Sequence, residues 1–170
     1  ALFPRGGSAR EPQAELRLPT RGSASLESLV HEFLKQTHAK PARMVFGIAG
    51  PVHGNVCVTT NLPWQVDGNA MGAEFGAHVT LLNDLETTAW GLGTLGSADL
   101  EVLQAGEETP GNRALIAAGT GLGEALLRWD GRTWQPMPSE GGHCDFGPRD
   151  TFEDELLHWL RARHGRVSYE

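Results

Sequence analysis

Short strand-like runs alternate with amphipathic helices along this chain, and the alternation restarts once. The first series ends with an apolar run over residues 79–82 that passes directly into a helical pattern. Gly91, Gly93 and Gly96 then interrupt the pattern before a second series begins. We therefore expect an α/β protein with two lobes, residues 1–93 and 94–170, in which mixed sheets are flanked by helices and a cleft separates the lobes. Clefts of this kind bind small ligands.

Two segments have the periodicity of helices that pack on a core. Ser25 can cap the first, where apolar residues recur every three or four positions over residues 26–34. Asp150 or Thr151 can cap the last helix of the chain. Residues 16–18 alternate as in a half-buried strand. The residues expected on the buried face of the last helix are Phe152, Leu156, Trp159 and Leu160.

Composition excludes several classes of protein. The chain of 170 residues has 14 basic and 21 acidic residues and a formal net charge of -7, without the clustered basic residues that a nucleic-acid-binding protein requires. No apolar run approaches the ~20 residues of a membrane span. Cys57 and Cys144 are far apart and belong to no CxxC pair, which argues against disulfides and structural zinc. We expect a cytoplasmic protein that binds neither nucleic acid nor membrane.

The first candidate site lies where the strand over residues 79–82 ends. A carboxylate at the carboxyl end of a sheet strand faces the crevice in which open α/β sheets bind ligands, and Asp84 has that position. Asp84 could equally serve only to cap the helix that follows. Asn83 offers amide donors and an acceptor that suit a hydroxyl group.

A glycine-rich segment over residues 119–123 lies between two apolar strands. No Gly-Lys-Ser/Thr follows it, and its third glycine comes too early for a dinucleotide fingerprint. Glycine permits close approach and positive φ, so the backbone N–H groups of such a turn can converge on phosphate oxygens. Thr120 could add a hydroxyl donor. A plain hairpin turn is the alternative interpretation.

Residues 140–143 have the sequence Glu-Gly-Gly-His, which brings an acid and an imidazole onto one tight loop. Both groups can form hydrogen bonds with vicinal hydroxyls. A metal site would need further ligands, and only Cys144 is adjacent. A solvated glycine turn is the other interpretation. Ser139, His143 and Asp145 do not make a hydrolytic triad, because Ser139 has no nucleophile elbow and three members within seven residues cannot easily converge.

Taken in order, six segments resemble the bacterial glucokinases, the non-repressor branch of sugar kinases in the actin, hexokinase and heat-shock ATPase superfamily. The resemblance implies ribonuclease-H-like (actin-like ATPase) lobes and the ATP-dependent phosphorylation of glucose to glucose 6-phosphate in glycolysis. It also implies magnesium (Mg2+) as a cofactor, glucose and ATP as small-molecule partners, and a possible homodimer at full length. The six segments are residues 47–52, 60–64, 82–84, 119–123, 140–146 and 165–170.

The same resemblance implies roles for individual residues. Asp84 would be the general base toward the sugar 6-hydroxyl. The residues that would hold or lie close to the other hydroxyls are Asn61, Asn83, Glu140, His143 and Glu170. The segment that matches the family's second phosphate-binding turn for ATP is Gly119, Thr120, Gly121, Leu122 and Gly123.

Two family segments are expected beyond the ends of this sequence. The Asp-Gly-Gly-Thr turn that opens the family would lie upstream of Ala1, and the adenine site would lie downstream of Glu170, so we expect the fragment to be inactive alone. The chain lacks the cysteine cluster of the repressor-type branch. A non-catalytic sugar-binding sensor of the same fold is the alternative function, although a sensor has no use for Asp84 as a base. A dinucleotide-dependent oxidoreductase would rest only on the glycine turn, which lacks a strand-turn-helix context.

Overall fold

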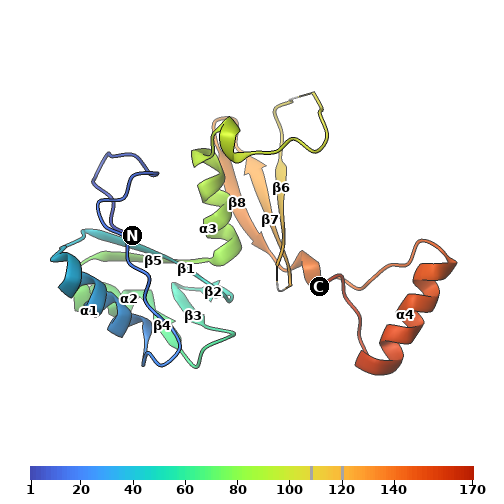
Figure 1. The fold of residues 1–170 in the computed structure, drawn as a ribbon, viewed down its shortest axis with the longest axis horizontal. Helices are drawn as coiled ribbons and strands as arrows, with labels where there is room; N and C mark the ends of the chain where they lie inside the picture. The colour runs from blue at the N-terminus through green and yellow to red at the C-terminus, as the bar shows by residue number, and fades with distance from the viewer. Residues whose placement is uncertain (108, 120) are drawn as a thin grey trace. The chain divides into compact units, whose positions relative to one another are not determined.

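The structure, a computed structural model, describes every residue of the chain except Glu108 and Thr120. It separates into two compact units, Ala1–Glu101 and Val102–Glu170 (Figure 1). The lobe boundary between residues 93 and 94 remains a prediction.

The first unit combines helices with a parallel and an antiparallel sheet. Strands β1 and β5 pair in parallel, and β2, β3 and β4 form an antiparallel sheet. Two short 3-10 turns, Leu92–Thr94 and Ser97–Asp99, follow the last helix. In chain order the elements are α1 (Leu26–Thr37), β1 (Arg43–Ile48), β2 (Val52–His53), β3 (Val56–Val58), β4 (Gln65–Asp67), α2 (Gly68–Phe75), β5 (His78–Asn83) and α3 (Asp84–Gly91).

Because side chains alternate along a strand, the two faces of the β1–β5 pair pack against different helices. Met44 on β1 and its register partner Val79 on β5 are buried in the main core, to which α1 contributes Val30 and α2 contributes Met71. Gly47, an odd number of positions from Met44, faces the other way and lies against α3. The pair is thus a thin layer between α1 and α2 on one side and α3 on the other (Figure 1).

The predicted first helix is confirmed, together with its cap. The Ser25 hydroxyl accepts from the Ser28 backbone N–H, and the Ser28 side chain accepts from the Ser25 N–H. The expected strand over residues 16–18 was wrong. The exposure of these residues alternates, but they have no ladder partner among the described residues. The N-terminal segment pairs instead through a single bridge between Leu2 and Ala14.

Asn55 joins the β2–β3 turn to β5. Its φ of 65° lies in the left-handed region, which asparagine tolerates better than most residues. Its Nδ2 donates to the Val79 carbonyl at 3.1 Å, and its Oδ1 accepts from the Leu81 N–H at 2.9 Å. The side chain therefore satisfies backbone groups of β5, the strand that leads to the candidate site.

The second unit is an antiparallel meander followed by a helix. Strands β6 (Arg113–Ala118), β7 (Leu122–Trp129) and β8 (Trp134–Ser139) pair in that order, and a hairpin turn at Asp130–Gly131 joins the last two. A 3-10 turn, η3 (Gly141–His143), and the helix α4 (Thr151–His164) complete the unit (Figure 1).

The expected buried face of α4 was wrong. Phe152 is 72% exposed and Trp159 is 51% exposed, whereas Leu157 is the buried residue of this helix. Of the two residues predicted as possible caps, Asp150 is the cap, since its side chain accepts from the Glu153 N–H at 2.8 Å. Periodicity identified the helix and its start, but no described segment covers the face that Phe152 and Trp159 form.

No helix among the described residues is both long enough and apolar enough to cross a lipid bilayer.

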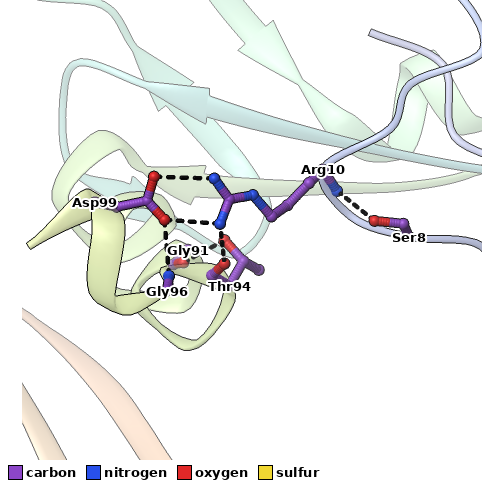
Figure 2. Close-up of polar contacts among 6 residues, drawn as sticks. All are labelled: Ser8, Arg10, Gly91, Thr94, Gly96 and Asp99. Carbon is purple, nitrogen blue, oxygen red and sulfur yellow. Dashed lines mark hydrogen bonds and ion pairs between the residues drawn. The ribbon is translucent and has the colours of Figure 1, made fainter.

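A bidentate ion pair between Arg10 and Asp99 holds the N-terminal loop against the segment after α3 (Figure 2). The two terminal nitrogens of Arg10 bind the two carboxylate oxygens of Asp99 at 2.7 and 2.9 Å. The Gly96 N–H also donates to Asp99, and the Thr94 carbonyl accepts from Arg10 at 3.4 Å. The hydrogen bond from Arg10, and next that from Gly96, keeps the pKa of Asp99 below its ordinary value.

This arrangement predicts a specific acid dependence. A lowered carboxyl pKa contributes stability above the unfolded-state value of about 4 and loses it as the pH falls through the folded-state value. In denaturant titrations at several pH values, the difference in unfolding free energy between the wild type and D99N should be largest near neutral pH and shrink below about pH 4. The control E11Q removes a negative charge from the same N-terminal loop. A difference between wild type and D99N that does not change with pH would contradict the prediction.

Candidate active site

In the first unit, the parallel register brings the ends of β1 and β5 to one edge. Ile48 and Asn83 are register partners, so the turn that follows β1 at Ala49–Gly50 and the helix that follows β5 start side by side. Gly50 has φ 146°, and a side chain there would meet the Val58 carbonyl at 2.9 Å. Only glycine fits this turn without strain.

Asn83 is the N-cap of α3, and the alternative in which Asp84 is the cap was wrong. The Asn83 Oδ1 accepts from the N–H groups of Leu85, at 2.9 Å, and Glu86, at 3.3 Å. Its Nδ2 donates to the Gly50 carbonyl at 3.3 Å. An amide oxygen has two lone pairs and an amide nitrogen has two hydrogens. One N–H of Asn83 therefore has no acceptor among the described residues and is left for a ligand.

Asp84 is the first residue of α3 and is exposed to solvent. Its Oδ1 accepts from the Leu85 N–H at 2.9 Å, and no described residue donates to its Oδ2. The positive end of the helix dipole favours a negative charge at this position. The carboxylate therefore has one engaged and one accessible oxygen.

Asn61 lies on an exposed loop that is fastened to the same turn. The N–H and the hydroxyl of Thr60 both reach the Ala49 carbonyl, at 3.3 and 3.4 Å. The Thr59 hydroxyl donates to the Leu62 carbonyl at 2.6 Å, which closes the loop. Hydrogen bonds therefore connect the Ala49–Gly50 turn both to the loop over residues 60–62 and to the start of α3.

In the second unit, the glycine segment lies between two strands, as expected, and these strands, β6 and β7, pair antiparallel. The Gly119 N–H donates to the Gly121 carbonyl at 2.9 Å. Leu122 and Gly123 belong to β7, where they pair with Ala118 and Ala117, so the turn is shorter than expected. Thr120 lies outside the described residues.

The loop of Glu140 and His143 packs directly on β7. A side chain at Gly142 would collide with the Leu122 carbonyl, and one at Gly141 would collide with the Glu124 carboxylate. The Gly141 N–H donates to the Ser139 hydroxyl at 3.0 Å. The two glycines therefore allow this loop to lie closer to β7 than residues with side chains would.

The end of the chain returns to this loop. The Glu170 N–H donates to the Gly142 carbonyl at 2.9 Å, and the Tyr169 N–H donates to the Cys144 carbonyl at 3.1 Å. The Glu170 carboxylate lies 3.2 Å from the His143 Nδ1 and also contacts Gly121. His143 Nε2 is 3.7 Å from the Glu140 carboxylate, so the imidazole lies between two acids.

An ion pair that sequence reasoning missed anchors the loop. The Arg166 Nε binds the Asp145 carboxylate at 2.7 Å, and another Arg166 nitrogen donates to the His143 carbonyl, also at 2.7 Å. The hydrogen bond and charge of Arg166 lower the pKa of Asp145. Both residues fall inside matched motifs, but their spacing of 21 positions gave no sign of the pair.

The predicted site residues thus form two groups, one in each unit. Asn61, Asn83 and Asp84 lie around the Ala49–Gly50 turn, and the second group surrounds His143. Glu124, which touches Gly141, is an acid that the sequence did not single out. Among the described residues, no three His, Cys, Asp or Glu side chains are placed to hold a metal ion. The members of the second group are Glu140, His143, Glu170 and Gly121.

Comparison with known proteins identifies relatives over nearly the whole chain. The family model for glucokinase matches residues 2–170. A glucokinase of Nostoc punctiforme is 39% identical over 150 residues, which are 85% of this chain and 44% of the relative. A glucokinase of Chelativorans sp. is 38% identical over 166 residues, which are 96% of this chain and 48% of the relative. The chain therefore spans about half the length of these curated relatives.

Solved structures agree with this finding. The glucokinase from an Antarctic psychrotroph superposes with a TM-score of 0.77 at 29% identity, over 90% of this chain and 48% of that protein. The glucokinase from Balamuthia mandrillaris, solved in complex with glucose, gives a TM-score of 0.62 over 85% of this chain and 46% of that protein. At 20% identity, the second match speaks for the fold alone.

The contact between the 140–143 loop and β7 predicts the effect of G142A. The added methyl group meets a backbone carbonyl that cannot turn aside, so the free energy of unfolding should fall by about 1–3 kcal/mol. In the control G147A, the methyl group meets only the Tyr169 hydroxyl at 3.6 Å, and the change should stay within about 0.5 kcal/mol. Denaturant unfolding measures both, and equal stability of the two variants would contradict the packing described here.

Proposed function

This chain belongs to the glucokinase family, and from that membership we propose that the whole protein containing it phosphorylates glucose at the 6-hydroxyl with ATP. Asp84 is the general base. The observation that carries the proposal is the environment of its carboxylate: one oxygen is held by the Leu85 N–H, and no described residue binds the other. A base needs one accessible oxygen in a fixed position.

Phosphoryl transfer requires the Asp84 carboxylate to be correctly positioned and does not require it to be unusually basic. Phosphoryl transfer passes through a loose transition state, so an ordinary carboxylate suffices once it directs the hydroxyl in line with the γ-phosphate. Asp84 accepts the proton of the 6-hydroxyl as the oxygen bonds to phosphorus, and ADP leaves. The cap made by Asn83 supports this role because it fixes the turn from which Asp84 projects.

The group around His143 holds other hydroxyls of the sugar. When Glu170 accepts from Nδ1–H, the Nε2 of a neutral imidazole, which lies 3.7 Å from the Glu140 carboxylate, can accept from a hydroxyl. Glu140 accepts from a second hydroxyl, and two carboxylates and one imidazole can together receive bonds from a vicinal pair. The spare N–H of Asn83 donates to a hydroxyl at the other group, and Asn61 lies close to the sugar.

ATP supplies the γ-phosphoryl group. We infer that the segment over residues 119–123 contacts its phosphates, since a side chain at Gly119 would meet nothing within 4 Å and a ligand can approach the backbone there. The described residues do not fit a resident metal site. Magnesium characteristically binds through few carboxylates and the phosphates of the nucleotide, so we assign none of these residues to it.

The finer features of the fold are part of the same proposal. The parallel β1–β5 pair with helices on both faces is compatible with ribonuclease-H-like lobes and a ligand cleft. A cytoplasmic location agrees with the free thiols of Cys57 and Cys144. We also propose, from the family resemblance, that the whole protein forms a homodimer.

The role of Asp84 predicts a loss of turnover without a loss of sugar binding. In the whole protein, D84N keeps the shape and the helix start but cannot accept the proton, so kcat should fall ~10² to 10⁴-fold. A coupled assay of glucose 6-phosphate measures kcat, and calorimetry measures the dissociation constant for glucose, which should change little.

The matched control is E86Q, which neutralises the next acid of the same helix and should retain wild-type turnover. Wild-type turnover in D84N would remove Asp84 from the role of base. If the wild-type protein itself bound glucose but produced no glucose 6-phosphate, the sugar-binding sensor would be favoured as the function.

For the group around His143, the proposed role in sugar binding predicts a change in KM rather than in kcat. In E140Q a charged acceptor becomes a neutral amide, and losing a charge-assisted hydrogen bond should raise KM for glucose about 10- to 100-fold, with a smaller effect on kcat. E155Q, an exposed acid on α4, is the control and should match the wild type. If KM is unchanged in E140Q, the sugar is not bound by this loop.

A further inference from the structure

The first turn of α3 rests on a glycine of β1. The Thr87 side chain lies so close to Gly47 that a Cβ added at Gly47 would be 2.7 Å from the Thr87 Oγ1, 3.0 Å from its Cβ and 3.1 Å from its Cγ2. The same hydroxyl donates to the Asn83 carbonyl at 2.9 Å. Thr87 therefore connects the strand beneath the helix with the residue that caps it.

Helix α3 depends on such contacts for its position. It spans only Asp84–Gly91, and isolated helices of this length are unstable in water. Of its side chains, only Ala89 is fully buried. The fixed points at its start are the Asn83 cap, with its bond to Gly50, and the contact of Thr87 with Gly47.

We propose that Gly47 and Thr87 are positioning residues for the general base: their close contact sets how near the first turn of α3 lies to β1, and so where Asp84 stands. The inference rests on the proposed function of Asp84. Neither residue needs to touch the sugar or the nucleotide. Gly47 acts through its missing side chain, and Thr87 acts through its shape and its bond to Asn83.

The steric relation makes the direction of the effect clear. A methyl group on Gly47 cannot coexist with Thr87 at these distances, so the start of α3 must move away from β1. A displacement of about 1 Å at a reacting group can cost ~10²-fold in rate. Sugar binding depends on several other side chains and should change far less.

The experiment is a two-residue cycle in the whole protein. G47A should lower kcat about 10- to 100-fold, with KM for glucose changed less than about threefold. T87A removes the Oγ1 and Cγ2 atoms, which lie 2.7 and 3.1 Å from the added Cβ, and leaves the Thr87 Cβ at 3.0 Å. By itself it should lower kcat only a fewfold. Because most of the clash is removed, the kcat of the double variant G47A/T87A should be closer to that of T87A alone than to the product of the two losses. The control G91A adds a methyl group at the other end of the same helix, in open space, and should match the wild type.

The outcomes separate this inference from the proposed function. Wild-type kcat in G47A, or a loss that T87A does not relieve, overturns the positioning role, whereas D84N alone tests the base. Should G47A fail to fold, T87V and T87S test the same contact. T87V keeps the branched shape without the hydroxyl and should lose kcat severalfold at constant KM, and T87S keeps the hydroxyl and should lose less. Equal activity of both variants with the wild type overturns the proposal.

Discussion

The parallel pairing of β1 with β5 is the constraint on which the first unit depends. Its register sets Ile48 beside Asn83, and for that reason the turn after one strand and the helix after the other begin at the same edge. The Asn83 side chain then bridges this edge by bonding to Gly50 while it caps α3. A shift of register by one residue would turn either Met44 or Val79 out of the core, so core packing and site geometry depend on the same pairing.

Glycines at points of close approach are a recurring device in both units. Gly47 admits Thr87, and Gly142 admits the backbone of β7, where any side chain would meet a fixed neighbour. Asp84 lies on α3, three positions before Thr87. Glu140 and His143 lie on the same loop as Gly142, within two positions of it. Tight backbone packing therefore limits how far these polar groups can move, which is what binding and proton transfer require.

Many of the helix starts and turns could be predicted from the sequence, because they depend on residues that are neighbours in the chain. The Ser25 cap, the junction of β5 with α3 and the hairpin at Asp130 all follow from residues close together in the chain. Contacts between residues far apart in the sequence could not be predicted. The Arg166–Asp145 pair joins distant positions, and the exposed face of α4 depends on which segments surround it. The cap of α3 was ambiguous because adjacent Asn and Asp are equally good caps, and only the backbone conformation distinguishes them.

The most direct test of the account is a crystal structure of the whole protein with bound glucose. The account predicts that a carboxylate oxygen of Asp84, the one without a partner among the described residues, lies about 2.6–3.2 Å from the glucose 6-hydroxyl oxygen. A glucose molecule whose 6-hydroxyl is held elsewhere, with the Asp84 carboxylate facing solvent away from the sugar, would contradict it.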